Sequence, residues 1–160
     1  MEQLASDLKA LVKSAAAQLR QVADGDASIK PAPGEWSYKE IVGHLIDSAG
    51  NNHQRFVRAQ RNESHDFPGY DQDEWVALQG YQARDWALLV TLWEAYNLHL
   101  ADVIAGIAED RLETACTIKG QPWTVREIAV DYVGHMQWHL DDLPVEVSDI
   151  KRYAYPKYPA

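Results

Sequence analysis

Hydrophobic positions recur along this chain with the i, i+3, i+4 spacing of amphipathic helices. The pattern predicts four long helices, which run from Leu4 to Val22, Ser37 to about Arg61, about Arg84 to Ile107, and Thr124 to Leu140. A shorter helix is expected after Asp71 or Asp73, interrupted near Gly80. Strand-like alternation is almost absent, apart from a few extended residues expected at 114–118. The chain is therefore predicted to be all-α and to form a four-helix bundle.

Local signals mark the ends of these helices. Two helix starts have the spacing of a capping box, Ser37 with Glu40 and Thr124 with Glu127. Gly25, between two aspartates, is expected to end the first helix, and Pro144 to stop the fourth. The tail from Lys151 is rich in Tyr and Pro and has the pattern of neither a helix nor a strand. It is expected on the surface or across a neighbouring subunit.

The connection over residues 62–83 is long, which argues against a simple up-down-up-down order because it lets the chain cross the bundle. The segments Trp36–Ile41 and Trp123–Ile128 share a tryptophan, a capping box, a basic residue and an isoleucine. This internal similarity favours two halves related by a pseudo-twofold axis, each of which contributes a pair of helices to a shared centre. The alternative is that any two capped amphipathic helices look alike.

Composition narrows the functional class. The 160 residues, 46% of them hydrophobic, suit one compact domain, and the net charge of −9 argues against binding nucleic acid or an anionic membrane through a basic face. No apolar run has the length of a membrane span, and the start of the chain does not read as a signal peptide. The single cysteine, Cys116, excludes an intrachain disulfide and a zinc site of several thiolates. A cytoplasmic protein is expected.

The histidines carry the most specific chemistry in the sequence. His135 and His139 are spaced i, i+4, which stacks two imidazoles on one helix face. His44 lies between Ile41 and Leu45 on the apolar side of another capped helix, so it is expected to face the same centre. Three neutral histidines from two helices would form a zinc or nickel site with open coordination positions.

Other residues are candidates for supporting roles. Three carboxylates are spaced to orient a ligating imidazole, Asp47, Asp131 and Asp142. Asp47 and Tyr132 are also candidates for proton transfer. The remaining histidines are less specific: His53 is expected to be solvated or behind the ligands, His65 in a loop, and His99 in the core or at the pocket.

Several segments resemble the DinB-like family of helical-bundle proteins. The similar segments are residues 33–37 and 40–48, the loop 68–71 with Trp75, residues 123–128, and Gly134–His139. The resemblance covers nearly all of residues 1–143 and leaves 144–160 as an extension. It implies an up-down-down-up bundle, often dimeric, with nickel or zinc held at His44, His135 and His139.

The resemblance also implies a choice of reactions on a small-molecule substrate. Some members of the family use the metal to activate a low-molecular-weight thiol for S-transfer, and many others are named as metal-dependent hydrolases. A charged thiol would need cations, and the candidates Arg55, Arg58 and Arg61 read more simply as a solvated helix face. The alternatives are a non-catalytic metal-binding or stress-associated interaction protein, and a bundle whose three histidines are merely buried.

Overall fold

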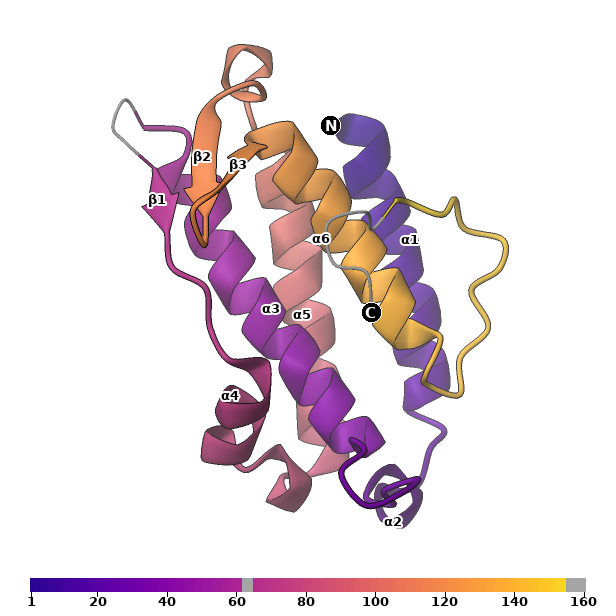
Figure 1. The fold of residues 1–160 in the computed structure, drawn as a ribbon. Coiled ribbons are helices and arrows are strands. Elements are labelled where there is room, and N and C mark those ends of the chain that lie inside the picture. Colours follow the sequence, from indigo (N-terminus) through magenta and orange to yellow (C-terminus); the bar gives the residue numbers. More distant parts are fainter. Residues whose placement is uncertain (62–64, 155–160) are drawn as a thin grey trace.

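The computed structural model describes residues 1–61 and 65–154. In this part of the chain four long helices form a bundle, α1 (Glu2–Leu19), α3 (Tyr38–Arg58), α5 (Trp86–Ala105) and α6 (Val125–Leu140) (Figure 1). Shorter turns lie in the connections, α2 (Asp24–Ala27), α4 (Gln72–Gln79), η1 (Tyr81–Ala83) and η2 (Glu109–Arg111). The predicted all-α four-helix bundle is confirmed.

The order of the helices follows from the long connection. After α3, the chain returns along the outside of the bundle through α4, so α3 and α5 run in the same direction (Figure 1). The helices α1 and α6 run the opposite way, which gives the up-down-down-up order. Contacts join α1 to α5 and α6, and α3 to α5 and α6. The predicted site residues His44, His135 and His139 lie on the antiparallel pair α3 and α6.

A small sheet closes one end of the bundle, and the sequence pattern largely missed it. Its strands are β1 (Asp66–Phe67), β2 (Ala115–Ile118) and β3 (Gln121–Thr124), with β1 parallel to β2 and β2 antiparallel to β3. The hairpin turn has Lys119 and Gly120 at φ angles of 51° and 72°, the left-handed conformation of a tight β-hairpin. The strands are too short to show alternation, and only the extended residues at 114–118 were expected.

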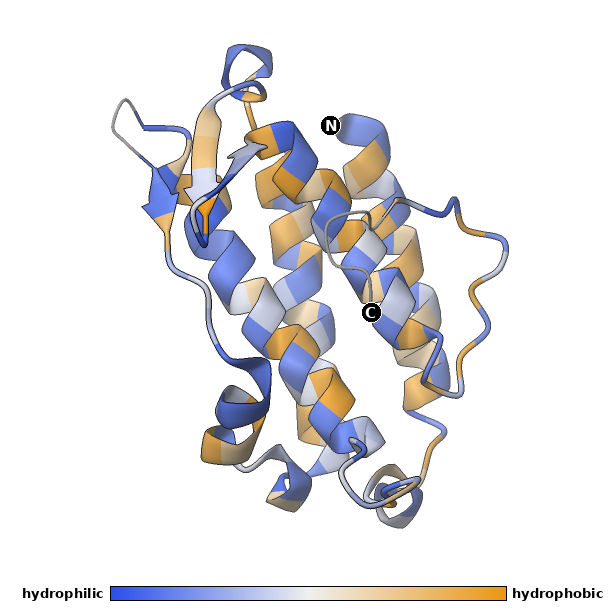
Figure 2. Cartoon of the chain, in the orientation of Figure 1, coloured by the Kyte–Doolittle hydropathy of each residue, from blue (hydrophilic) through white to orange (hydrophobic). Residues whose placement is uncertain are grey.

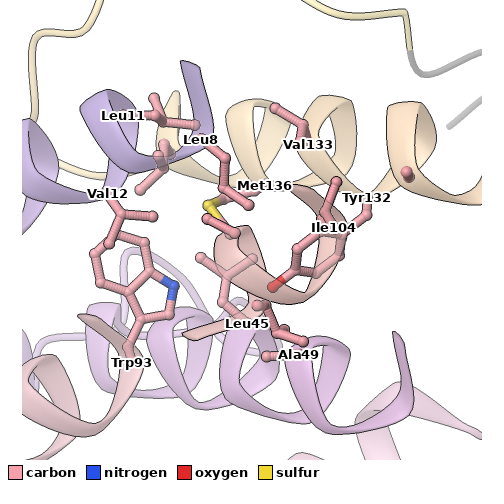
Figure 3. Packing of buried hydrophobic residues seen from close by; sticks show 14 of the residues in the cluster. Leu8, Leu11, Val12, Leu45, Ala49, Trp93, Ile104, Tyr132, Val133 and Met136 are labelled. Atoms are coloured by element: carbon pink, nitrogen blue, oxygen red, sulfur yellow. The ribbon is translucent and has the colours of Figure 1, made fainter. Parts of the chain in front are cut away.

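The core lies where the four long helices meet. Each helix carries hydrophobic and hydrophilic residues (Figure 2), and the hydrophobic ones are buried between helices. Leu8, Leu11 and Val12 of α1 pack towards Met136 of α6 and Trp93 of α5 (Figure 3). These large side chains are fully or almost fully buried, so the bundle is a rigid support for the side chains at its edge.

Both predicted capping boxes are present. The Ser37 side chain accepts a hydrogen bond from the backbone N–H of Glu40, and the Glu40 carboxylate accepts one from the backbone of Ser37. Thr124 and Glu127 make the same pair of contacts at the start of α6. The two helices that carry the predicted ligands are therefore fixed at their N-termini by the same device.

The chain after α1 differs from the prediction. The first helix ends at Leu19, and residues expected to break it form the single turn α2. The Asp24 carboxylate accepts hydrogen bonds from the backbone N–H of Trp86 (3.0 Å) and from Lys39 (2.8 Å). These tertiary contacts hold the turn against α3 and α5. They also keep the pKa of Asp24 below its ordinary value.

The segment after α6 packs back on the bundle up to the last described residue, Ala154. The Tyr153 hydroxyl donates to Asp7 (2.5 Å), and its backbone N–H donates to the Gln137 side chain (2.9 Å). Gln137 also donates to the carbonyl of Lys151 (2.8 Å). The start of the tail thus lies on α1 and α6 of its own chain, and residues 155–160 lie outside the described part. Among the described helices, none is both long and apolar enough to cross a membrane.

Candidate metal centre

Three histidines converge between α3 and α6. His44 comes from α3 and His135 and His139 from α6, and one ring nitrogen of each lies within 4.8 Å of the others. The Nε2 atoms of His44 and His135 are 3.2 Å apart. The His139 ring centroid lies 4.6 Å from each of the other two ring centroids. The three histidines that the sequence singled out therefore form one cluster.

The spacing suits a first-row metal ion. Two nitrogens that each lie about 2.0–2.1 Å from a tetrahedral ion are separated by roughly 3.3 Å. The observed 3.2 Å between the two Nε2 atoms agrees with that value. The same distance also suits a hydrogen bond between two neutral imidazoles, so the third histidine matters. Two rings can satisfy each other by one hydrogen bond, whereas three ring nitrogens within 4.8 Å of one another are a group that could hold a cation.

The protonation states also suit metal binding. Burial lowers the pKa of His44 to about 4. Burial, with the neighbouring imidazoles as a smaller cause, lowers the pKa of His135 to about 3 and that of His139 to about 2. All three rings are therefore neutral near pH 7, and each has a lone pair to offer a cation.

Contacts behind the rings set their orientation. Ser48 Oγ lies 3.4 Å from Nδ1 of His135, and with the proton on Nδ1 that N–H donates to the serine. Nδ1 of His44 is buried and has no hydrogen-bond partner among the described residues. Ser48, one turn beyond His44 on α3, thus supports a ligand on the opposite helix, a role that sequence analysis did not assign to it.

Packing fixes His44 from the far side of α3. The neighbouring residue Gly43 faces the ring of Tyr81 in η1, and a side chain at Gly43 would overlap that ring. The Tyr81 hydroxyl donates to the Asp47 carboxylate (2.7 Å), to which the Gln79 side chain also donates. Burial raises the pKa of Asp47. Asp47 therefore joins α3 to the segment around η1.

Two hollows border the cluster. The inner cavity, of about 130 Å³, includes His44, Ser48, Arg55, Lys119, Asp131 and His135 among its walls. The outer groove, of about 390 Å³, includes Glu35, Trp36, Asp73, Trp138, His139 and Asp142. The Trp36 ring lines the outer groove, with its centroid 5.1 Å from that of His44 and 6.2 Å from that of His139. The ring partly shields the imidazoles while leaving both hollows beside them.

Residues 2–143 match the sequence profile of the DinB superfamily. The chain belongs to the DinB superfamily. The match spans the four long helices and all three histidines, so the resemblance predicted from the two histidine segments is confirmed. The match ends at residue 143, and the division into a bundle of residues 1–143 and an extension of residues 144–160 stays a prediction.

Relatives of this DinB chain have names that refer to metal-dependent hydrolysis. A Bacillus licheniformis protein named a "putative metal-dependent hydrolase" is 26% identical over 145 residues, covering 88% of this chain and 81% of that protein. An Oceanobacillus iheyensis protein of the same name is 25% identical over 118 residues, with coverage of 72% and 67%. YfiT from Bacillus subtilis, described as a "probable metal-dependent hydrolase with an unusual four-helix bundle topology", matches the fold with a TM-score of 0.65 and 15% identity over 89% of each chain.

The other predicted residues lie in different surroundings. Asp131 and Asp142 line the inner cavity and the outer groove, respectively. His53 and His99 form a separate pair between α3 and α5, with ring centroids 5.2 Å apart. His99 is exposed, so the expectation that it lies in the core or at the pocket is wrong. His65, expected in a plain loop, is buried against Phe67 and hydrogen-bonds the carbonyl of Arg61 (3.0 Å).

Two basic residues of the cavity were misjudged or missed. Arg55 was expected on a solvated helix face, yet it lines the inner cavity together with His44. Lys119 was not considered, because it lies in a turn distant in sequence from every histidine. The Lys119–Gly120 pair between two short apolar segments is a hairpin signal that could have found it. Cys116, within the residues expected to be extended, is buried in β2, where burial raises the pKa of its thiol.

Proposed function

We propose that this protein is a metal-dependent hydrolase of small molecules in which His44, His135 and His139 hold one divalent ion, zinc or nickel. The observation that carries the proposal is the convergence of three neutral imidazoles beside two hollows. Structural zinc sites usually close with four protein ligands, so three ligands beside open space favour catalysis over a structural role. The names of the relatives support the same reaction class.

A divalent ion at this site would supply Lewis-acid polarisation of a substrate oxygen and a water molecule of lowered pKa. The chain's own residues prepare the site for that chemistry. Burial keeps the imidazoles neutral, and Ser48 orients His135. Trp36 shields two of the rings from bulk water on one side. The two hollows give a substrate room on both sides of the cluster.

The two predicted proton carriers have contacts that favour structural roles. The Asp47 carboxylate accepts hydrogen bonds from Tyr81 and Gln79. Tyr132 lines the inner cavity, but it is almost fully buried, its hydroxyl donates to Asn97, and burial raises its pKa well above the ordinary value. Both groups are therefore held in hydrogen bonds within the bundle.

Thiol S-transfer is the second candidate. The sequence alone indicated no cation near the metal for a charged thiol, whereas the position of Arg55 in the structure favours this reaction. A charged thiol such as the one implied by the family resemblance needs a cation near the metal, and Arg55 lines the same cavity as His44. In that reaction a thiolate displaces the leaving group of an electrophile. The expected homodimer and cytoplasmic location also stay predictions, and light scattering of the purified protein tests the first.

The deciding experiment combines metal content with turnover. The metal content of untagged protein, purified without a nickel column, is measured by elemental mass spectrometry alongside that of His135→Ala. The control is His99→Ala, which removes an exposed histidine away from the cluster. We expect close to one zinc or nickel per chain in the wild type and the control, and a loss in His135→Ala. The three proteins are then assayed for hydrolysis of carboxylic and phosphate esters, and for thioether formation from a thiol and an alkyl halide.

Each outcome selects a function. Ester hydrolysis that disappears with the metal supports the hydrolase, and thioether formation that does so favours the transferase. Stoichiometric metal without either reaction favours a non-catalytic metal-binding protein. Wild-type protein that contains no metal and takes up neither added zinc nor added nickel overturns the proposal, since the histidines are then buried residues only.

A further inference from the structure

Charge is divided unevenly between the two hollows beside the histidines. Among the described residues, the walls of the inner cavity include the cations Arg55 and Lys119 and one carboxylate, Asp131. The walls of the outer groove include three carboxylates, Glu35, Asp73 and Asp142, and no lysine or arginine. The net charge of the whole chain is −9, so a small cavity lined by two cations and one carboxylate differs in sign from the chain as a whole. An anion approaching the cluster is repelled by the groove and attracted by the cavity.

Lys119 is an exposed residue, and two features of the backbone influence where its side chain lies. Lys119 has a φ of 51°, and within the described residues it is the only one other than glycine with a positive φ. The left-handed turn directs this lysine towards the loop after β1, where its aliphatic stem lies against Gly69. A Cβ at position 69 would overlap the Lys119 side chain, so the missing side chain of Gly69 provides the space for it.

Within the described part of the chain, the ammonium group of Lys119 has no carboxylate partner. Across residues 1–61 and 65–154, no ion pair joins it to an aspartate or glutamate. Among the other described lysines, Lys9, Lys30 and Lys39 each pair with a carboxylate. Lys13 and Lys151 form no ion pair within the described residues either, but neither of them lines the cavity. Beside it in the cavity, Arg55 is oriented by a hydrogen bond from its Nη1 to Asn52 Oδ1 (3.2 Å).

We infer that Lys119, with Arg55 beside it, binds an anionic group of the substrate, a carboxylate or a phosphate, while the reacting part of the molecule faces His44 and His135. An ammonium supplies a point charge and a guanidinium a planar fork, and both suit oxyanions. The cavity, of about 130 Å³, has room for the anionic group and little more. That the bound anion belongs to a substrate rests on the proposed function. The binding of an anion at Lys119 requires no metal.

Backbone NMR of metal-free and zinc-loaded protein tests this directly, with inorganic phosphate, propionate and the uncharged propionamide as probes. We expect phosphate or propionate to shift the amide signals of Gly69, Lys119 and Gly120, and propionamide to shift none of them. The tighter of the two anions identifies which oxyanion the site prefers. Both should bind more weakly as the salt concentration rises.

Matched variants separate this lysine from general charge effects. Lys119→Gln should weaken anion binding roughly fivefold to tenfold, since it removes one charge-assisted contact. Lys119→Arg should restore it. Lys13→Gln makes the same charge change on the exposed face of α1 and should leave binding unchanged. Gly69→Ala keeps every charge but displaces the lysine stem, so it should weaken anion binding as well.

The outcomes are distinct from those of the metal experiment. Anion shifts in metal-free protein that depend on Lys119 support the site whatever the metal analysis finds. The inference is overturned if neither anion moves these amides with or without zinc, or if Lys13→Gln weakens binding as much as Lys119→Gln. Zinc uptake by the same samples reports on the histidines separately, so failure of the anion site leaves the metal proposal standing.

Discussion

Nε2 of His44 and Nε2 of His135 lie 3.2 Å apart, although 91 residues separate the two histidines in the sequence. The contact exists because α3 and α6 pack antiparallel, each with its N-terminus fixed by a capping box. Ser48, one turn after His44, meets the other ring nitrogen of His135. One helix therefore supplies both a ligand and the support for a ligand on its neighbour.

Ser48→Ala should weaken zinc binding about tenfold, because partners of the second ring nitrogen typically contribute that much to the affinity of a metal site. The loss is expected without a large change in stability, since the serine hydrogen bond to His135 is long. Competition with a fluorescent zinc chelator measures the affinity. Ser14→Ala, on α1 away from the cluster, is the control, and equal affinities for all three proteins would exclude a role for Ser48.

Two glycines of α3 make a matched test of how His44 is positioned. In Gly43→Ala the new methyl group overlaps the Tyr81 ring, and overpacking of this kind costs on the order of 1–3 kcal/mol. In Gly50→Ala the methyl group meets only the Tyr96 hydroxyl at 3.9 Å, so the better helix propensity of alanine should leave stability equal or up to about 1 kcal/mol higher. Thermal unfolding of both variants checks the difference. A Gly43→Ala protein as stable as the wild type would mean that η1 is not packed as described.

The sequence predicted the helices and the histidine cluster because both depend on short-range patterns. Apolar periodicity and the two capping boxes placed α3 and α6, and the i, i+4 pair placed His135 and His139 on one face. Those signals fix which way a side chain points, and two correctly placed helices are sufficient to bring three histidines together.

The residues that the sequence misjudged depend on long-range packing. Asp47 has a suitable spacing from His44 to orient its imidazole. Because Gly43 has no side chain, the Tyr81 ring packs against α3, and its hydroxyl donates a hydrogen bond to the Asp47 carboxylate. Arg55 is three turns beyond His44 and looked remote. It nevertheless lines the same cavity as His44, together with Lys119 of the β2–β3 turn. Neither the turn nor the η1 contact leaves a pattern within any one helix.

Stability of the metal-free protein should fall as the pH drops from about 6.5 towards 4. A histidine of an unfolded chain takes up a proton near pH 6.5, whereas burial lowers the pKa of His44 to about 4 and those of His135 and His139 further. In that window the unfolded state binds more protons, so the free energy of unfolding decreases by up to about 1.4 kcal/mol per pH unit for each histidine. The raised pKa of Asp47 acts in the opposite direction.

Urea unfolding at pH 7.5, 6.5, 5.5 and 4.5 measures this dependence. His135→Gln should reduce the slope by about one proton, because it removes one of the three groups with a lowered pKa. A wild-type slope of zero between pH 6.5 and 4.5 would show that the three imidazoles are not kept neutral by the fold.

Gly134→Ala should detach the segment after α6 while leaving the bundle folded. A Cβ at position 134 would lie 2.7 Å from the carbonyl oxygen of Ala154, and backbone atoms on both sides leave little room to adjust. The hydrogen bonds of Tyr153 to Gln137 and Asp7 would then be lost together. Since Gly134 directly precedes His135, the variant also reports whether the docked segment steadies the metal ligands.

Hydrogen exchange followed by mass spectrometry checks this last prediction. Amides of residues 145–154 should exchange faster in Gly134→Ala, whereas those of α1 and α3 should keep their protection. Tyr153→Phe removes only the hydroxyl contact with Asp7 and should speed exchange of the same segment less. If zinc affinity falls in Gly134→Ala in step with the faster exchange, the segment after α6 contributes to the metal centre. If affinity is unchanged, the segment acts on stability alone.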